Sequence, residues 1–175
     1  MRNLLVLNYA KVQRLLYLVL GPPGSGRQTI VQDLIEGGLT DGESALTLTT
    51  EESNDMEGCT PWHWENGAFH IPENTGNTEA THLFLIFSPY LNIADQIEAS
   101  LDLLDGDGEL TLARVLLVVH CGLIDKASTQ LQDWHDACAH FADVALLNRL
   151  EGVKNKKVKE FKEHYESMRL PFLVE

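Results

Sequence analysis

Short runs of apolar residues alternate along this chain with longer segments in which apolar residues recur at helical spacing. The apolar runs, rich in Val, Leu and Ile, predict buried strands at residues 14–21, 44–50, 82–88, 113–120 and 143–148. The amphipathic segments predict helices at residues 27–38, 93–104, 127–141 and 158–168. Strands that alternate with helices in this way predict an α/β fold, with a mostly parallel central sheet of six or seven strands flanked by helices.

The segment from residue 51 to residue 81 breaks this rhythm because it is polar and interrupted by Gly and Pro. It leaves room for one brief strand at residues 67–71 and otherwise predicts a long loop, where functional residues often lie. Trp62 and Trp64 would share one side of an extended chain, which suits either a hydrophobic plug or a contact with a partner protein.

The length of 175 residues and the apolar content of 44% fit one compact domain spanning residues 1–175. The chain carries 26 acidic and 13 basic residues, and the net charge of -13 predicts a surface that repels nucleic acid and anionic membranes. Lysines near the carboxyl end alternate with glutamates around a predicted helix, which favours a solvated helix face over a binding patch. These lysines are Lys154, Lys156, Lys157, Lys159 and Lys162.

The cysteines and the apolar amino-terminal stretch bear on location. Cys59, Cys121 and Cys138 are too few and too scattered for a disulfide framework, which favours a reducing compartment. Lys11 and Arg14 interrupt the apolar stretch at residues 4–21, so it predicts neither a membrane span nor a signal peptide. We therefore expect a cytoplasmic protein.

The first predicted strand runs into the segment LVLGPPGSGRQT, which has the glycine spacing of a phosphate-binding loop. Gly21 and Gly26 stand at the interval of the pattern G-x-x-x-x-G-K-[ST], the loop follows a strand, and it opens a helix. Backbone amides near residues 24–27 at a helix amino terminus attract anions. A glycine-rich turn without a ligand is the alternative. The phosphate-binding hypothesis includes Gly21, Gly24, Ser25, Gly26, Arg27, Gln28 and Thr29.

Three of these positions depart from the pattern. Arg27 replaces the lysine and keeps its charge, but its planar guanidinium is larger than an ammonium group. Gln28 stands where a hydroxyl would bind magnesium, and Thr29 is one residue out of register. The loop therefore predicts phosphate or nucleotide binding with weakened magnesium binding and doubtful hydrolysis. A domain of this kind is expected to be a P-loop NTPase-like three-layer sandwich.

A second segment, AHFADVALLNRLE at residues 139–151, resembles the FAD...LLNKTD segment of CobW-like GTPases, a P-loop family of metal chaperones and cobalamin-synthesis proteins. In that family N-K-x-D recognises guanine, and the matching positions here include Asn148, Arg149 and Glu151. The resemblance implies GTP or GDP as the ligand. Glu151 is one methylene longer than the aspartate of the family, whereas an arginine can also lie over a base. A polar turn after a strand is the alternative.

Other family motifs are altered. Pro89 stands where the family has a magnesium-linked glutamate. Cys59 matches the first cysteine of the family's C-x-C-C motif, but Pro61 and Trp62 replace the later two. The resemblance covers most of residues 14–174 and has no counterpart to the family's C-terminal domain. It implies a divergent member reduced to the nucleotide-binding core.

Further groups of polar residues suggest weaker hypotheses. Cys59, His63 and His70 could converge on zinc, although their spacing also fits separate loop residues. The DGDGE segment at residues 105–109 fails the spacing of a calcium loop and predicts a turn. Asp136 is expected to pair with His140 one helical turn away. His120 and Cys121 end a strand at the edge of the sheet where ligands bind, which makes them candidates for lining the site.

The main functional hypothesis is a protein that binds a guanine nucleotide weakly, with impaired or no hydrolysis. It requires the loop after the first strand and the turn near residue 148 to face a common cleft, about one nucleotide length apart. The alternatives are a non-enzymatic protein-interaction module that keeps the fold, with a protein partner bound through residues 62–64, and an ATP-dependent kinase-like enzyme. The scarcity of arginines, six in the chain, argues against a kinase lid.

Overall fold

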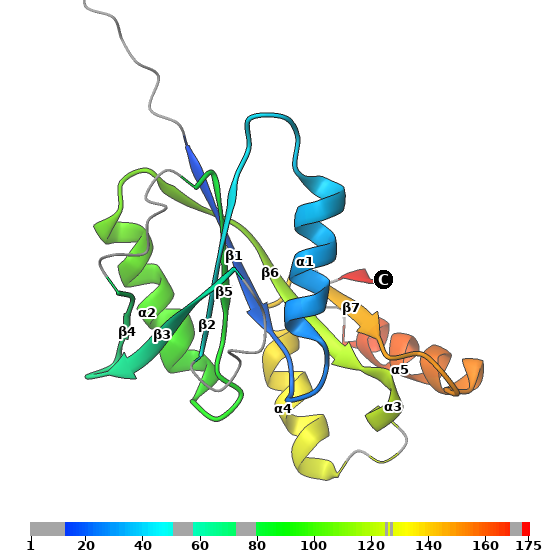
Figure 1. Cartoon of the computed structure of the whole chain (residues 1–175). Coiled ribbons are helices and arrows are strands. Elements are labelled where there is room, and N and C mark those ends of the chain that lie inside the picture. Colours follow the sequence, from blue (N-terminus) through cyan, green and yellow to red (C-terminus); the bar gives the residue numbers. More distant parts are fainter. Residues whose placement is uncertain (1–12, 51–57, 73–79, 125, 127, 169–172) are drawn as a thin grey trace, which may run out of the picture.

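An eight-stranded sheet forms the centre of the computed structural model, which describes residues 13–50, 58–72, 80–124, 126, 128–168 and 173–175 (Figure 1). The strands are β1 (Arg14–Leu20), β2 (Ala45–Thr50), β3 (Cys59–Glu65), β4 (Ala68–His70), β5 (His82–Ile86), β6 (Leu110–His120), β7 (Val144–Asn148) and β8 (Leu173–Val174). The helices are α1 (Arg27–Gly38), α2 (Ile93–Gly106), α3 (Cys121–Ile124), α4 (Thr129–Ala139) and α5 (Asn155–Ser167).

The strand order is β4-β3-β2-β5-β1-β6-β7-β8, which places β1 in the middle between β5 and β6. All pairs are parallel except β3 with β4, which is antiparallel. The carboxyl ends of the parallel strands therefore meet at one edge of the sheet, and the loop after β1 emerges at the centre of that edge.

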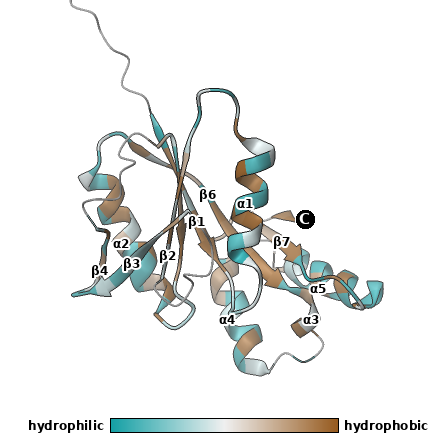
Figure 2. Ribbon diagram, in the orientation of Figure 1, coloured by the Kyte–Doolittle hydropathy of each residue, from teal (hydrophilic) through white to brown (hydrophobic). Residues whose placement is uncertain are grey.

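Helices lie on both faces of the sheet, as the opposite positions of α1 and α2 in Figure 1 show. Alternating residues of β1 supply the two cores: Leu16 and Leu18 face a large cluster, and Val19 faces a smaller one. The large cluster includes residues of α2, α4 and α5, and the smaller one includes Val31 of α1. Figure 2 shows the mainly hydrophobic central strands. Strands buried on both faces read as continuous apolar runs, which is why the sequence predicts them well.

A bulge interrupts the pairing of β1 with β6. Leu16 pairs with Leu112 and Tyr17 pairs with Arg114, so Ala113 has no partner on β1. In a regular strand, residues an odd number of steps apart point to opposite faces of the sheet. Leu110 and Val115 are five steps apart, yet both pack in the large core cluster, because the extra residue between them shifts the alternation of side chains by one.

The predicted α/β fold with a mostly parallel sheet is confirmed, and some elements differ in detail. The sheet has eight strands rather than six or seven, because residues 59–65 form a strand within the predicted loop and β8 is added at the far edge. The brief strand expected at residues 67–71 is β4, and the unpredicted helix α3 follows β6 directly. Helix α4 begins at Thr129, where the Ser128 hydroxyl caps the Leu131 amide at 3.3 Å. Its expected start at residue 127 lies outside the described residues, as do residues 4–12 of the apolar amino-terminal stretch.

The lysines of α5 pair with glutamates on the same helix. Lys156 lies 3.6 Å from Glu160, and Lys159 lies 3.5 Å from Glu163. These pairs are exposed and one helical turn apart, as predicted for a solvated helix face. Lys162 differs, because its Nζ donates to the Val174 carbonyl at 3.0 Å and is partly buried. None of the helices that the structure describes is both long and apolar enough to cross a membrane.

Candidate phosphate-binding site

The loop between β1 and α1 wraps tightly at the carboxyl edge of the sheet. Gly24 and Gly26 adopt left-handed backbone conformations, with φ of 74° and 85°, which favour glycine. The Ser25 amide donates to the Pro22 carbonyl at 3.2 Å and closes the turn. Gly26 is the N-cap of α1, and no side chain caps the helix among the described residues. The first amides of α1 thus lie at the loop, where an anion can bind them.

Two glycines are required by close contacts. A Cβ atom at Gly21 would lie 2.7 Å from the Ser25 hydroxyl and 2.8 Å from the Val118 carbonyl oxygen. At Gly26 it would lie 2.5 Å from Nδ2 of Asn148. The glycine spacing that suggested a phosphate loop therefore has a steric basis in this chain.

Asn148, the last residue of β7, joins its own turn to the loop after β1. Its Nδ2 donates to the Ser25 carbonyl at 2.8 Å, and its Oδ1 accepts from the Arg149 amide at 2.8 Å. The two turns lie at the same edge of the sheet, as expected. They are closer than one nucleotide length at Asn148, because this side chain bridges them directly.

Arg149 follows with φ of 59°, a left-handed conformation that is uncommon outside glycine. The side chain of Arg149 approaches the loop, since a Cβ atom at Gly26 would lie 3.7 Å from its Nε. Backbone strain of this kind is often retained at ligand sites.

A pocket of about 340 Å³ lies between the two turns. This volume falls in the range of small-molecule sites. The described residues that line it are Pro23, Gly24, Gly26, Arg27, Gln28, Thr29, Thr50, Ile86, Pro89, Tyr90 and Arg149. Six of the predicted site residues are therefore brought together here.

The other predicted site residues lie outside the lining of the pocket. Gly21 and Ser25 are buried behind it, and Asn148 contacts the loop from the side of β7. Glu151 is exposed in the turn that follows β7.

Arg27 takes an orientation that the sequence does not predict. Its Nη1 donates to the backbone carbonyl of Phe87, just beyond β5. Burial lowers the pKa of Arg27 to about 10, while nearby Tyr90 acts in the opposite direction, so the guanidinium stays charged at neutral pH. Its positive charge is thus held beside the pocket by the edge of β5.

The donor set of the pocket fits an anion better than a hard cation. Two arginines line it and, among the described lining residues, none is Asp or Glu. The Ser25 hydroxyl is fully buried and has no hydrogen-bond partner in the described part of the chain. Magnesium prefers carboxylate and phosphate oxygens, so a metal ion here would depend mainly on a bound phosphate.

The predicted plug is present beside this pocket. Trp62 is 2% exposed, and its Nε1 donates to the Ile86 carbonyl at 3.0 Å. The Phe69 ring packs edge-on against Trp62 and Trp64, with centroids 4.9 and 5.2 Å away, so the two tryptophans do share one side of the strand. Trp62 supports the pocket wall from inside and is not accessible to a partner.

Three of the weaker hypotheses can be compared with the structure. The prediction that Asp136 pairs with His140 is wrong, because Asp136 Oδ1 instead lies 3.2 Å from His164 Nε2 and accepts from the Tyr165 hydroxyl at 3.0 Å. Of the turn predicted at residues 105–109, Asp105 and Gly106 instead end α2, and residues 107–109 form the turn, where Asp107 makes an ion pair of 2.9 Å with Arg14. His120 pairs with Asn148 across the strands but does not line the pocket.

Cys121, the other candidate at this edge, is 1% exposed and does not line the pocket. Burial raises the pKa of the Cys121 thiol, which does not favour a reactive thiolate.

Sequence reasoning missed Thr50 and Tyr90 as pocket residues. Thr50 ends β2, and Tyr90 follows β5 with 70% of its surface exposed. Their only sequence signal is a position at or just beyond the end of an apolar run, and the strand order that brings them beside β1 is needed to identify them.

No protein-family model matches the chain, and no curated protein matches it. Among solved structures, the chain is similar to the Zn(II)-bound YjiA GTPase from E. coli, with a TM-score of 0.63 and 14% sequence identity. It is also similar to a Zn(II)-bound triple mutant of the YjiA GTPase, with a TM-score of 0.64 and 13% identity. Each match covers 93% of this chain and 57% of the other chain. The chain therefore shares an α/β fold with the YjiA GTPase and spans just over half of the length of the structures that it matches.

Proposed function

We propose that this protein is a divergent relative of the CobW-like GTPases that binds a guanine nucleotide weakly and hydrolyses it slowly or not at all. The observation that carries the proposal is the pocket between the glycine loop and Arg149, closed at its base by the bond from Asn148 to Ser25. The fold that the chain shares with the YjiA GTPase supports the same conclusion.

Each side of the pocket has its own role in this proposal. The backbone at Gly24 and Gly26 would hold the phosphates, with Arg27 supplying positive charge. Arg149 would cover the base, since a guanidinium stacks well on an aromatic ring. Asn148 and Glu151 would contact the edge of the base.

The same features account for slow or absent hydrolysis. Magnesium, when bound, would neutralise phosphate charge, and Gln28 or Thr29 would face it. The described lining offers it no carboxylate, since Pro89 occupies the place where the family has a glutamate. Arg27 is engaged with the Phe87 carbonyl, which limits its reach toward a transferring phosphate.

Binding of labelled GTP, GDP and ATP, each with and without magnesium, tests the proposal. We expect GTP and GDP to bind more tightly than ATP, with little gain from magnesium. Equal affinity for GTP and ATP would support phosphate binding but not a guanine site. If none of the three nucleotides binds at millimolar concentration, the proposal is wrong.

A double substitution tests whether the loop is an altered form of the usual pattern. Arg27→Lys with Gln28→Thr restores the residues of the G-x-x-x-x-G-K-[ST] pattern and should increase GTP affinity in the presence of magnesium. Gln32→Thr, one helical turn further along α1 and outside the pocket lining, is the matched control.

A substitution in the second turn tests the contact with the base. Glu151→Asp, which shortens the carboxylate, should increase the preference for GTP over ATP if Glu151 contacts the base.

A further inference from the structure

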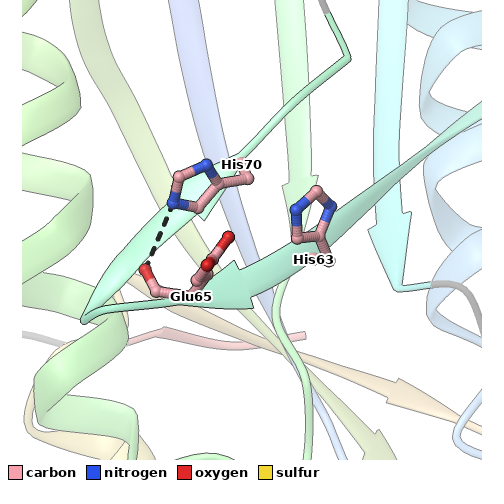
Figure 3. A group of neighbouring side chains, drawn as sticks. All are labelled: His63, Glu65 and His70. Carbon is pink, nitrogen blue, oxygen red and sulfur yellow. Dashed lines mark hydrogen bonds between the residues drawn. The ribbon is translucent and has the colours of Figure 1, made fainter.

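Three possible metal ligands gather on the hairpin of β3 and β4, at the outer edge of the sheet (Figure 3). His63 and Glu65 are two residues apart on β3 and therefore point to the same face of the sheet. His70 lies directly opposite His63 in the antiparallel register. All three residues are exposed, so an ion from solvent can reach them.

The hairpin holds these residues in place through its turn. Asn66 and Gly67 both have positive φ, of 52° and 80°, as a two-residue type I′ turn requires. Phe69, between the turn and His70, packs against Trp62 and Trp64 on the other face of the hairpin. The turn and this aromatic packing fix the register that brings the two histidines together.

The three side chains are close enough to share one ion. One ligand atom of each lies within 4.8 Å of the others, and the two imidazole rings are 5.2 Å apart between centroids. Ligands of a tetrahedral ion with bonds of about 2.0–2.1 Å are separated by roughly 3.3 Å. Small rotations of three exposed side chains would close this difference.

The orientation of His70 also suits a ligand. Its Nε2 lies 3.2 Å from the backbone carbonyl oxygen of Glu65, which can only accept a hydrogen bond. Nε2 therefore carries a hydrogen, which leaves Nδ1 as the nitrogen available to a metal ion. Histidines that bind metals commonly donate their second ring nitrogen to a carbonyl in this way.

We propose that His63, Glu65 and His70 form a binding site for a divalent transition-metal ion of the zinc type. Two imidazoles and one carboxylate favour zinc, nickel or copper over magnesium and calcium, which prefer oxygen ligands alone. Three protein ligands leave a fourth position open to water or to another donor. None of the three residues lines the pocket between the two turns, although His63 lines a neighbouring hollow that shares Thr50 and Tyr90 with it. The metal site does not depend on the proposed function.

The sequence hypothesis of a zinc site from Cys59, His63 and His70 is wrong in one ligand. Cys59 lies four residues before His63 on the same strand, a distance of about 13 Å along extended chain. It pairs with Thr47 of β2 and lines a different hollow beside α1. Glu65, not Cys59, completes the group with the two histidines among the described residues.

Titration of the tag-free 175-residue chain with zinc against a chromophoric chelator tests the site. We expect one equivalent of zinc to bind, and His63→Ala or His70→Ala to weaken its binding by at least tenfold. Removing a residue that only hydrogen-bonds to a metal ligand commonly lowers the affinity for the metal by about 10- to 100-fold, so removing a ligand itself should lower it at least as much. Glu65→Gln should also weaken binding. His140→Ala, which removes an exposed histidine elsewhere, should leave it unchanged.

The visible absorption of bound cobalt provides a second measurement, because it reports which atoms coordinate the ion. We expect a spectrum of nitrogen and oxygen ligands that disappears in His63→Ala and is unchanged in Cys59→Ser. Far-ultraviolet circular dichroism checks that each variant remains folded. Absence of zinc binding in the wild-type chain would overturn the proposal. Binding that survives both histidine substitutions, or that is lost in Cys59→Ser, would overturn it as well.

Discussion

Asn148 donates a hydrogen bond of 2.8 Å to the backbone carbonyl of Ser25, although 123 positions separate the two residues in the sequence. This bond links the end of β7 to the loop after β1 across the intervening strand β6. It therefore makes the two halves of the candidate site depend on one another.

Removing the Asn148 side chain should affect both stability and binding. We expect Asn148→Ala to lower the free energy of unfolding by about 1 kcal/mol, the typical value of one such hydrogen bond. Urea denaturation measures this change, and nucleotide titration should show weaker binding. Asn155→Ala, at the exposed start of α5, should change neither quantity. Equal effects of the two substitutions would argue against a specific role for the bond.

The loop glycines provide a test that separates steric clash from backbone strain. Gly24 and Gly26 both have positive φ, but a Cβ atom meets nothing within 4 Å at Gly24 and meets Asn148 Nδ2 at 2.5 Å at Gly26. Gly24→Ala should therefore cost about 1 kcal/mol from strain alone. Gly26→Ala should cost more and should displace Asn148. Chemical denaturation of both variants measures the difference, and equal losses would contradict the contact.

Two substitutions at Arg149 should separate the strain of its backbone from the role of its side chain in binding. Its φ of 59° is strained for any residue except glycine. Arg149→Gly should therefore be more stable than Arg149→Ala, by about 1 kcal/mol in the free energy of unfolding. Both variants lose the guanidinium and should bind GTP more weakly than the wild-type chain. If Arg149→Ala is as stable as Arg149→Gly, the left-handed conformation is not maintained in solution.

His135 should make stability depend on pH. The side chain is 2% exposed, and burial lowers its pKa from 6.5 to about 4, with the charge of nearby Asp136 opposing the change. Above about pH 6.5 the histidine is neutral in both states and the full stability is present. As the pH falls toward 4, His135 binds a proton in the unfolded chain but not in the folded chain. Stability should then fall by about 1.4 kcal/mol per pH unit.

Urea denaturation at several pH values measures this dependence. His135→Leu cannot take up the proton and should have a smaller slope between about pH 6.5 and pH 4. His140→Ala, which removes an exposed histidine after α4, should keep the wild-type slope. Parallel slopes in the wild-type chain and in His135→Leu would assign the pH dependence to other groups.

The extent to which the fold could be predicted follows from burial. Strands such as β5, in which every residue is buried, appear in the sequence as unbroken apolar runs. Strand β3 was missed because Pro61 and alternating polar residues are typical of a loop, although the Asn66-Gly67 turn is a recognisable hairpin signal.

The candidate site was predictable where its residues are neighbours in the chain. The interval between Gly21 and Gly26 is a local pattern, so the sequence located the loop. The positions of Thr50 and Tyr90 depend on β5 lying between β2 and β1, an order that no local pattern encodes. The partner of Asp136 was predicted wrongly for the same reason, because His164 comes from a different helix.

The unpaired Ala113 in β6 has a consequence for how this protein can change. Deleting it would leave Leu110 and Val115 an even number of steps apart, so a regular strand would keep both in the large core cluster, and the half that ends at His120 would stay in register with Asn148. The loss of this one codon is therefore a length change that the central sheet can absorb without misaligning the two turns that enclose the pocket.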